Sequence, residues 1–166
     1  TKRPWRYVRG GRRNRRVTAR TPFRLTGPAA GSPLVRTAAD PAGRTALGTF
    51  GNCSGGTTPW GTILSGEENF NGYFVADPAA RGSKRYGLTN TPSVYGWEKI
   101  DERFDAPKPG DANEPHLFGY IVEIDPQNAS STPRKHTAMG RFKHEGATLH
   151  VASDGRVVAY MGDDER

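Results

Sequence analysis

The sequence predicts an all-β protein made of antiparallel strands and long loops, with at most one short helix. Hydrophobic residues are only 34% of the 166 residues, whereas glycine occurs 21 times and proline 13 times, which is typical of loop-rich β proteins. Residues 118–125 alternate like a strand, and residues 147–161 form two apolar runs around an Asp-Gly turn, a strong hairpin signal. Strands without convincing helices between them indicate an antiparallel meander of the kind that a propeller blade uses.

The net charge of +7 is concentrated at the start of the chain. Residues 1–44 carry 12 basic residues and one acid, whereas residues 45–166 carry 12 basic and 16 acidic residues. Arginines alternate with Trp5 and Tyr7, so this segment could neutralise nucleic-acid phosphates and stack on bases. The alternatives are a rim that attracts an anionic substrate and a solvated edge. Of these three interpretations, we do not expect nucleic-acid binding.

Residues 21–40 are expected to form loops and short extended pieces, because four prolines between positions 22 and 41 interrupt any helix. A glycine-rich loop around Cys53, the only cysteine, then leads into a short strand at residues 62–65. Glycines let this backbone turn tightly and approach a ligand without a Cβ clash.

Two adjacent acids, Glu67 and Glu68, follow that strand. Successive strand residues face opposite sides, so we expect only one of the two to be a ligand. A thiolate and carboxylates around one strand would suit a metal ion. The alternative is a small buried cysteine beside a solvated acidic pair.

Residues 77–115 are expected to form a long excursion from the sheet. Within it, Trp97, Ile100 and Phe104 have helical spacing, which indicates one short amphipathic helix capping the sheet. In the strand at residues 118–125, the alternate residues starting at Phe118 are expected to share one face.

The acids near the end of the chain leave two interpretations open. In an extended segment Arg141, Lys143 and Glu145 share one side, which would suit a phosphate and metal site or a surface ion pair. Asp163 and Asp164 could hold calcium, which prefers carboxylate and carbonyl oxygens, or be solvated.

Five segments of the chain resemble the PhoX family of alkaline phosphatases. They span nearly the whole chain in the expected order: NRRVTARTPFRLTGPAAG, GNCSGGTTPWGTILSGEENFNGYF, FGYIVEIDP, GRFKHEGA and MGDDER. The resemblance implies a large β-propeller, six-bladed in whole members, of which residues 1–166 would be an incomplete N-terminal or internal portion of a single domain.

The resemblance also implies a reaction and its cofactors. Family members hydrolyse phosphate esters with a cluster of iron (Fe3+) and calcium (Ca2+), and a cysteine thiolate is among the iron ligands. This implies metal ligands at Cys53, at Glu67 or Glu68, and at Glu145. Asp164 would be a further ligand, and Arg141 would lie near the site as a phosphate contact.

Further expectations follow from the same resemblance. The isolated chain should be inactive, because the remaining acidic ligands of the family lie in the part that follows. The whole protein should be periplasmic or secreted and monomeric, although this chain shows no signal peptide and no apolar run long enough to cross a membrane. A non-catalytic propeller that serves as a binding platform is the main alternative.

Overall fold

A computed structural model describes residues 6–12 and 14–165. Within these residues the chain forms strands and short 3-10 turns, with no α-helix, so the all-β prediction is confirmed. The strands are β1 Pro22–Thr26, β2 Thr45–Leu47, β3 Asn52–Thr57, β4 Ile63–Glu67, β5 Ile121–Ile124, β6 Arg134–His136, β7 Thr148–Val151 and β8 Val157–Tyr160. The 3-10 turns are η1 Pro33–Val35, η2 Phe70–Tyr73, η3 Lys84–Tyr86, η4 Trp97–Lys99, η5 Glu102–Phe104, η6 Glu114–Leu117 and η7 Thr137–Met139.

The main sheet has six strands in the order β2-β1-β6-β5-β4-β3. Strands β3 to β6 are antiparallel neighbours in chain order, which is the predicted meander. One pairing lies outside the meander, because β1 pairs with β6 in parallel. The connection between these two strands contains four other strands, and such a long crossover permits parallel pairing.

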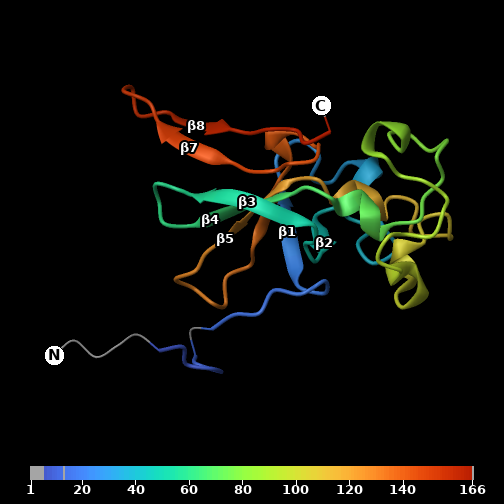
Figure 1. Cartoon of the computed structure of the whole chain (residues 1–166), viewed down its shortest axis with the longest axis horizontal. Helices are drawn as coiled ribbons and strands as arrows, with labels where there is room; N and C mark the ends of the chain where they lie inside the picture. Colours follow the sequence, from blue (N-terminus) through green and yellow to red (C-terminus); the bar gives the residue numbers. More distant parts are fainter. Residues whose placement is uncertain (1–5, 13, 166) are drawn as a thin grey trace.

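The second sheet is the two-stranded hairpin β7-β8. It confirms the prediction from the Asp-Gly turn, where Gly155 has a φ of 82°. Figure 1 shows this hairpin beside β3, with the excursion of residues 77–115 gathered at the other end of the molecule. The backbone of Ala147, just before β7, lies against Gly56 of β3, so the hairpin is anchored to the main sheet at its base.

Two predicted elements are shorter than expected. The strand at residues 118–125 begins only at Ile121, because Gly119 has a φ of 92°, which strand residues do not adopt. A continuous helix over residues 97–104 is not formed. The turns η4 and η5 replace it because Asp101 is extended and its side chain accepts a hydrogen bond from the backbone N–H of Arg103.

An aromatic core fills the space between the main sheet and the excursion. The rings of Phe50 and Phe118 stack with centroids 4.1 Å apart, and Phe104 meets Trp97 edge-on at 5.1 Å. Phe70, Phe104 and Phe118 are almost completely buried. Burying each such side chain stabilises the folded protein by about 1.5–3 kcal/mol. This core holds the excursion against the sheet without an α-helix.

The basic N-terminal segment is only partly described. Trp5 lies outside the described residues, as does Arg13, while Tyr7 is 81% exposed. Residues 6–12 project from the body of the molecule (Figure 1), whereas Ala19 packs against the core. In the part of the chain that the structure describes, no helix is long and apolar enough to cross a membrane.

Candidate metal centre

Glu67 ends β4 with its carboxylate turned into the protein. The carboxylate accepts hydrogen bonds from the backbone N–H groups of Gly119 and Tyr120, at 3.0 and 3.2 Å, and from Lys135 Nζ at 2.7 Å. The Glu67 side chain is fully buried. Both of its oxygens are therefore occupied inside the protein, on the side away from the surface.

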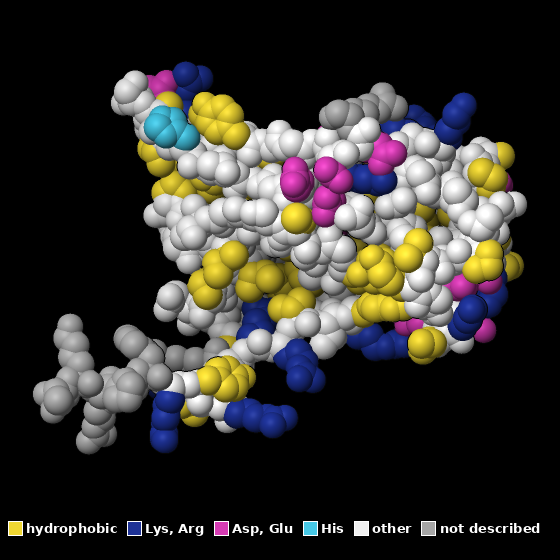
Figure 2. All heavy atoms as spheres, viewed as in Figure 1, with side chains coloured by type: hydrophobic (Ala, Val, Ile, Leu, Met, Phe, Trp, Pro, Cys, Tyr) yellow, Lys and Arg dark blue, Asp and Glu magenta, His cyan; other side chains and the backbone are white. Residues whose placement is uncertain are grey.

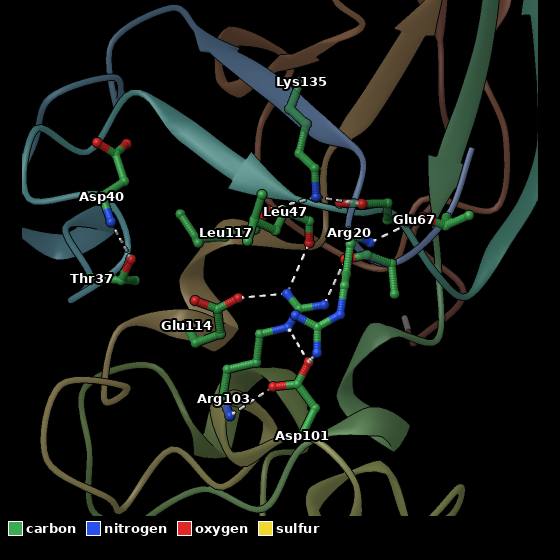
Figure 3. A network of polar contacts seen from close by, with 12 residues as sticks. Arg20, Thr37, Asp40, Leu47, Glu67, Asp101, Arg103, Glu114, Leu117 and Lys135 are labelled. Carbon is green, nitrogen blue, oxygen red and sulfur yellow. Dashed lines mark hydrogen bonds and ion pairs between the residues drawn. The ribbon is translucent and has the colours of Figure 1, made fainter. Parts of the chain in front are cut away.

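Lys135 lies on β6 and is the buried partner of Glu67 (Figure 3). Its ammonium group also donates to the carbonyl of Leu117 at 2.9 Å and lies 3.8 Å from the centroid of the Phe118 ring. Burial lowers the pKa of Lys135, and the charge of Glu67 opposes that shift. Because an unpaired buried charge is costly, this pair fixes the end of β4 against β6.

Glu68 faces the other way, as strand alternation predicts, and is half-buried near the surface. Burial raises the pKa of Glu68, and the neighbouring carboxylates of Asp164 and Glu145 raise it further, whereas the Cys53 thiol lowers it. Asp164, Glu145 and Cys53 therefore lie near enough to act on the Glu68 carboxyl. The four residues thus lie in one neighbourhood, but within the described chain they do not form a group that could enclose an ion.

A glycine turn positions the Cys53 side of this group. The backbone N–H of Glu68 donates to the carbonyl of Gly51 at 3.0 Å. Gly51 has a φ of 64°, and a Cβ there would lie 2.9 Å from the carbonyl carbon of Asn69, so only glycine fits without a shift. Two residues later Cys53 is exposed on β3, where the register with β4 shifts as in a β-bulge.

Backbone pairing positions the other two acids. The segment around His144 pairs with the segment around Asp163, and the N–H of Asp164 donates to the carbonyl of Lys143 at 3.1 Å. His144 is buried, whereas Glu145 is exposed, so the two side chains face opposite sides. Figure 2 shows acidic side chains gathered on this face, between β3 and the end of the chain.

The four side chains of Cys53, Glu68, Glu145 and Asp164 provide one soft donor and three hard ones. Thiolate suits iron, and carboxylates suit calcium or iron. Within residues 6–12 and 14–165, none of the three acids forms an ion pair with a basic side chain. Their negative charge is thus uncompensated, which fits a cation site. In the described chain no three such residues are yet close enough to enclose an ion.

Arg141 lies apart from this group. Its guanidinium donates to the carbonyls of Phe118 and Pro115, at 2.8 Å each. It also lies 3.8 Å from the centroid of the Tyr86 ring. The structure therefore does not bring Arg141 together with the four expected ligands, and its role as a phosphate contact stays a prediction.

Sequence reasoning missed the residues that hold the site from behind. Lys135 sits between two other basic residues, and nothing in that run indicates a buried ammonium group. Outside the site, Arg103 is a second largely buried cation that the sequence did not indicate: it pairs with Glu114 at 2.8 Å (Figure 3) and donates to the carbonyl of Ala19 at 2.7 Å. Alternation in β6 could at most have placed Lys135 on an inward face.

The comparisons with known proteins point to one family. The family model described as alkaline phosphatase PhoX matches residues 1–166. Among solved structures, Pseudomonas fluorescens PhoX in complex with vanadate, a transition state analogue, is 48% identical, with a TM-score of 0.90. That match covers 98% of this chain and 28% of the other. The search of curated proteins found no match.

Proposed function

The chain belongs to the PhoX family of alkaline phosphatases, and from this premise we propose that it is part of a metal-dependent enzyme that hydrolyses phosphate esters. It spans 28% of the length of the Pseudomonas fluorescens protein, so the activity is proposed for the whole protein. The observation that carries the proposal is the family match over residues 1–166; the raised pKa of Glu68, to which Asp164 and Glu145 contribute, adds that these acids lie near one another.

We assign the metal ligands of this chain to those four residues. Cys53 as a thiolate would hold iron, and Glu68, Glu145 and Asp164 would hold iron or calcium through their carboxylates. Glu68 is the better candidate of the adjacent glutamates, because Glu67 already accepts three hydrogen bonds inside the protein. Bound ions would supply charge neutralisation and Lewis-acid activation of the phosphate group.

The remaining roles belong to the chain's own side chains. The buried pair of Glu67 and Lys135 would keep the end of β4 in place while the ions bind and leave. Arg141 would contact the phosphate only if its guanidinium exchanged its two carbonyl partners for phosphate oxygens. We keep this role as a separate prediction. A complete ligand set would need further acids, so the isolated chain should be inactive.

The test of this assignment is Cys53→Ala in the whole protein. We expect iron content, measured by elemental mass spectrometry, and turnover of p-nitrophenyl phosphate to fall together by at least tenfold. Ser54→Ala is the matched control, because it also removes one small polar atom from an exposed position of β3 and should change neither. Retained iron with normal turnover in Cys53→Ala would overturn the assignment.

A non-catalytic propeller that serves as a binding platform is the second candidate. It is favoured by the open arrangement of the acids, none of which forms an enclosing group within the described chain. Protein that is metal-free after native purification, and still inactive when iron and calcium are supplied, would favour this candidate. Export from the cytoplasm and a monomeric state rest on the family alone and remain predictions.

A further inference from the structure

A cavity of about 260 Å³ lies away from the candidate metal centre. It opens between the loop that contains η1, the segment around η3, and Arg141. Its lining residues are Ala29, Ser32, Leu34, Val35, Arg81, Gly82, Arg85, Tyr86, His116, Tyr120 and Arg141. The lining includes none of the four proposed metal ligands and no carboxylate. The cavity is therefore distinct from that centre, although Arg85 and Tyr86 also line a small neighbouring hollow with Asp163 and Glu165.

Arg141 forms the inner part of the cavity and has no anionic partner. Its hydrogen bonds go to two neutral carbonyls, and within residues 6–12 and 14–165 it forms no ion pair. Glu67, whose charge acts on it from a distance, is already bound by Lys135. Burial lowers the pKa of Arg141. A guanidinium that has lost water without gaining an anion is a site where an anion binds favourably.

Two further arginines line the same cavity near the surface. Arg81 and Arg85 are exposed, and neither forms an ion pair with any residue in the described ranges. Burial lowers the pKa of His116 and outweighs the hydrogen bond between its Nδ1 and the carbonyl of Leu34 at 2.8 Å, which acts in the opposite direction, so His116 adds little charge near neutral pH. The positive charge of the cavity therefore comes from arginines, which stay protonated at any ordinary pH.

The rest of the cavity wall is apolar. Leu34 and Val35 lie on one side. The Tyr86 ring lies on the other, held by the stacked guanidinium of Arg141 and by a hydrogen bond from its hydroxyl to the Arg141 carbonyl at 3.2 Å. Because Arg141 packs against this ring, the cationic and apolar parts of the cavity lie in direct contact.

We propose that this cavity binds a small organic oxyanion, a carboxylate or a phosphate monoester. Its charged group would bridge Arg141 and the arginines at the rim, and its apolar part would lie against Leu34 and Tyr86. The planar fork of arginine matches both kinds of oxyanion. A volume of about 260 Å³ accommodates one such group with a ring-sized body.

The test is calorimetric titration of the whole metal-loaded protein with benzoate and with phenylphosphonate, whose C–P bond a phosphatase does not hydrolyse. We expect saturable binding of at least one of them. The double variant Arg81→Met and Arg85→Met should weaken that binding about tenfold or more, since hydrogen bonds to charged groups are strong. Lys84→Met is the matched control, because Lys84 lies between the two arginines but does not line the cavity.

Two further outcomes separate this site from the metal centre. Binding that persists in Cys53→Ala but is lost in the double arginine variant assigns the oxyanion to the cavity. Binding that is lost in Cys53→Ala and kept in the double variant places the oxyanion at the metal centre and overturns the proposal. The absence of saturable binding for both compounds overturns it as well. All three variant positions are exposed, and a thermal melt of each variant checks that it folds.

Discussion

At the end of β4, two neighbouring glutamates meet different surroundings. Glu67 lies among the N–H groups of Gly119 and Tyr120 and the ammonium of Lys135, where each oxygen has a donor. Glu68 lies among other acids, and its pKa is raised by burial and by those acids. One carboxylate therefore stabilises the fold, whereas the charged form of the other is disfavoured by its surroundings.

This contrast predicts that a change to glutamine affects stability at Glu67 and metal content at Glu68. Glu67→Gln leaves Lys135 as an unpaired buried charge and should destabilise the protein by about 3–5 kcal/mol. Glu68→Gln removes a half-buried acid and should change stability by less than about 0.5 kcal/mol, while lowering the metal content. Thermal melts and elemental analysis of the two whole-protein variants check this. Normal metal content in Glu68→Gln would exclude it as a ligand.

Glu123 gives a pH-dependent prediction at the same scale. Burial raises its pKa, but hydrogen bonds from Thr62, Trp60 and His136 outweigh burial and lower it overall. Because the folded pKa lies below the unfolded one, Glu123 contributes stability above the ordinary pKa of 4.5. That stability is lost as the pH falls through the lowered value.

The expected result is measured with Glu123→Gln. At pH 7 the variant should be less stable by about 2 kcal/mol, because the hydrogen-bond donors around position 123 lose a charged acceptor. As the pH falls below 4.5, its melting temperature should approach that of the parent, because the parent loses the same interaction. The basic side chains facing Glu123 are Arg134 and His136. A constant difference in melting temperature from pH 7 to 3 would contradict the prediction.

Among the elements, the turn between β2 and β3 determines where Cys53 lies relative to Glu68. Gly51→Ala adds a Cβ 2.9 Å from the backbone of Asn69 at a φ of 64°, which should cost about 1–3 kcal/mol and move Cys53 away from the other ligands. Gly61→Ala is the matched control: its φ is 87°, but a Cβ there meets nothing within 4 Å. We expect both variants to be destabilised and only Gly51→Ala to lose metal. Equal metal loss would mean that strain alone is responsible.

What the sequence could predict at this scale was local. The hairpin of β7 and β8 follows from a short Asp-Gly pattern, and the opposite orientation of Glu67 and Glu68 follows from strand alternation. Which of the two glutamates faces inward depends on Lys135, which is 68 positions away in the sequence. The parallel pairing of β1 with β6 is likewise a long-range contact that no local pattern specifies.

On the scale of the whole molecule, the two sheets differ in how well they are supported. The aromatic core packs against the main sheet, whereas Val151, Val157 and Tyr160 of β7 and β8 are exposed. A two-stranded sheet is only marginally stable by itself. The chain covers 28% of the matched Pseudomonas fluorescens structure, so we expect the hairpin to pack against other parts of the whole protein.

Hydrogen exchange tests this expectation. In the isolated chain of residues 1–166, the amides of β7 and β8 should exchange much faster than those of β4 and β5, because local opening of a poorly buried hairpin costs little. In the whole protein the hairpin amides should be protected to a similar degree as the central strands. Fast exchange of the hairpin in both forms would mean that the hairpin remains exposed in the whole protein. The acids that follow it, including Asp164, would then lack a rigid support for a metal site.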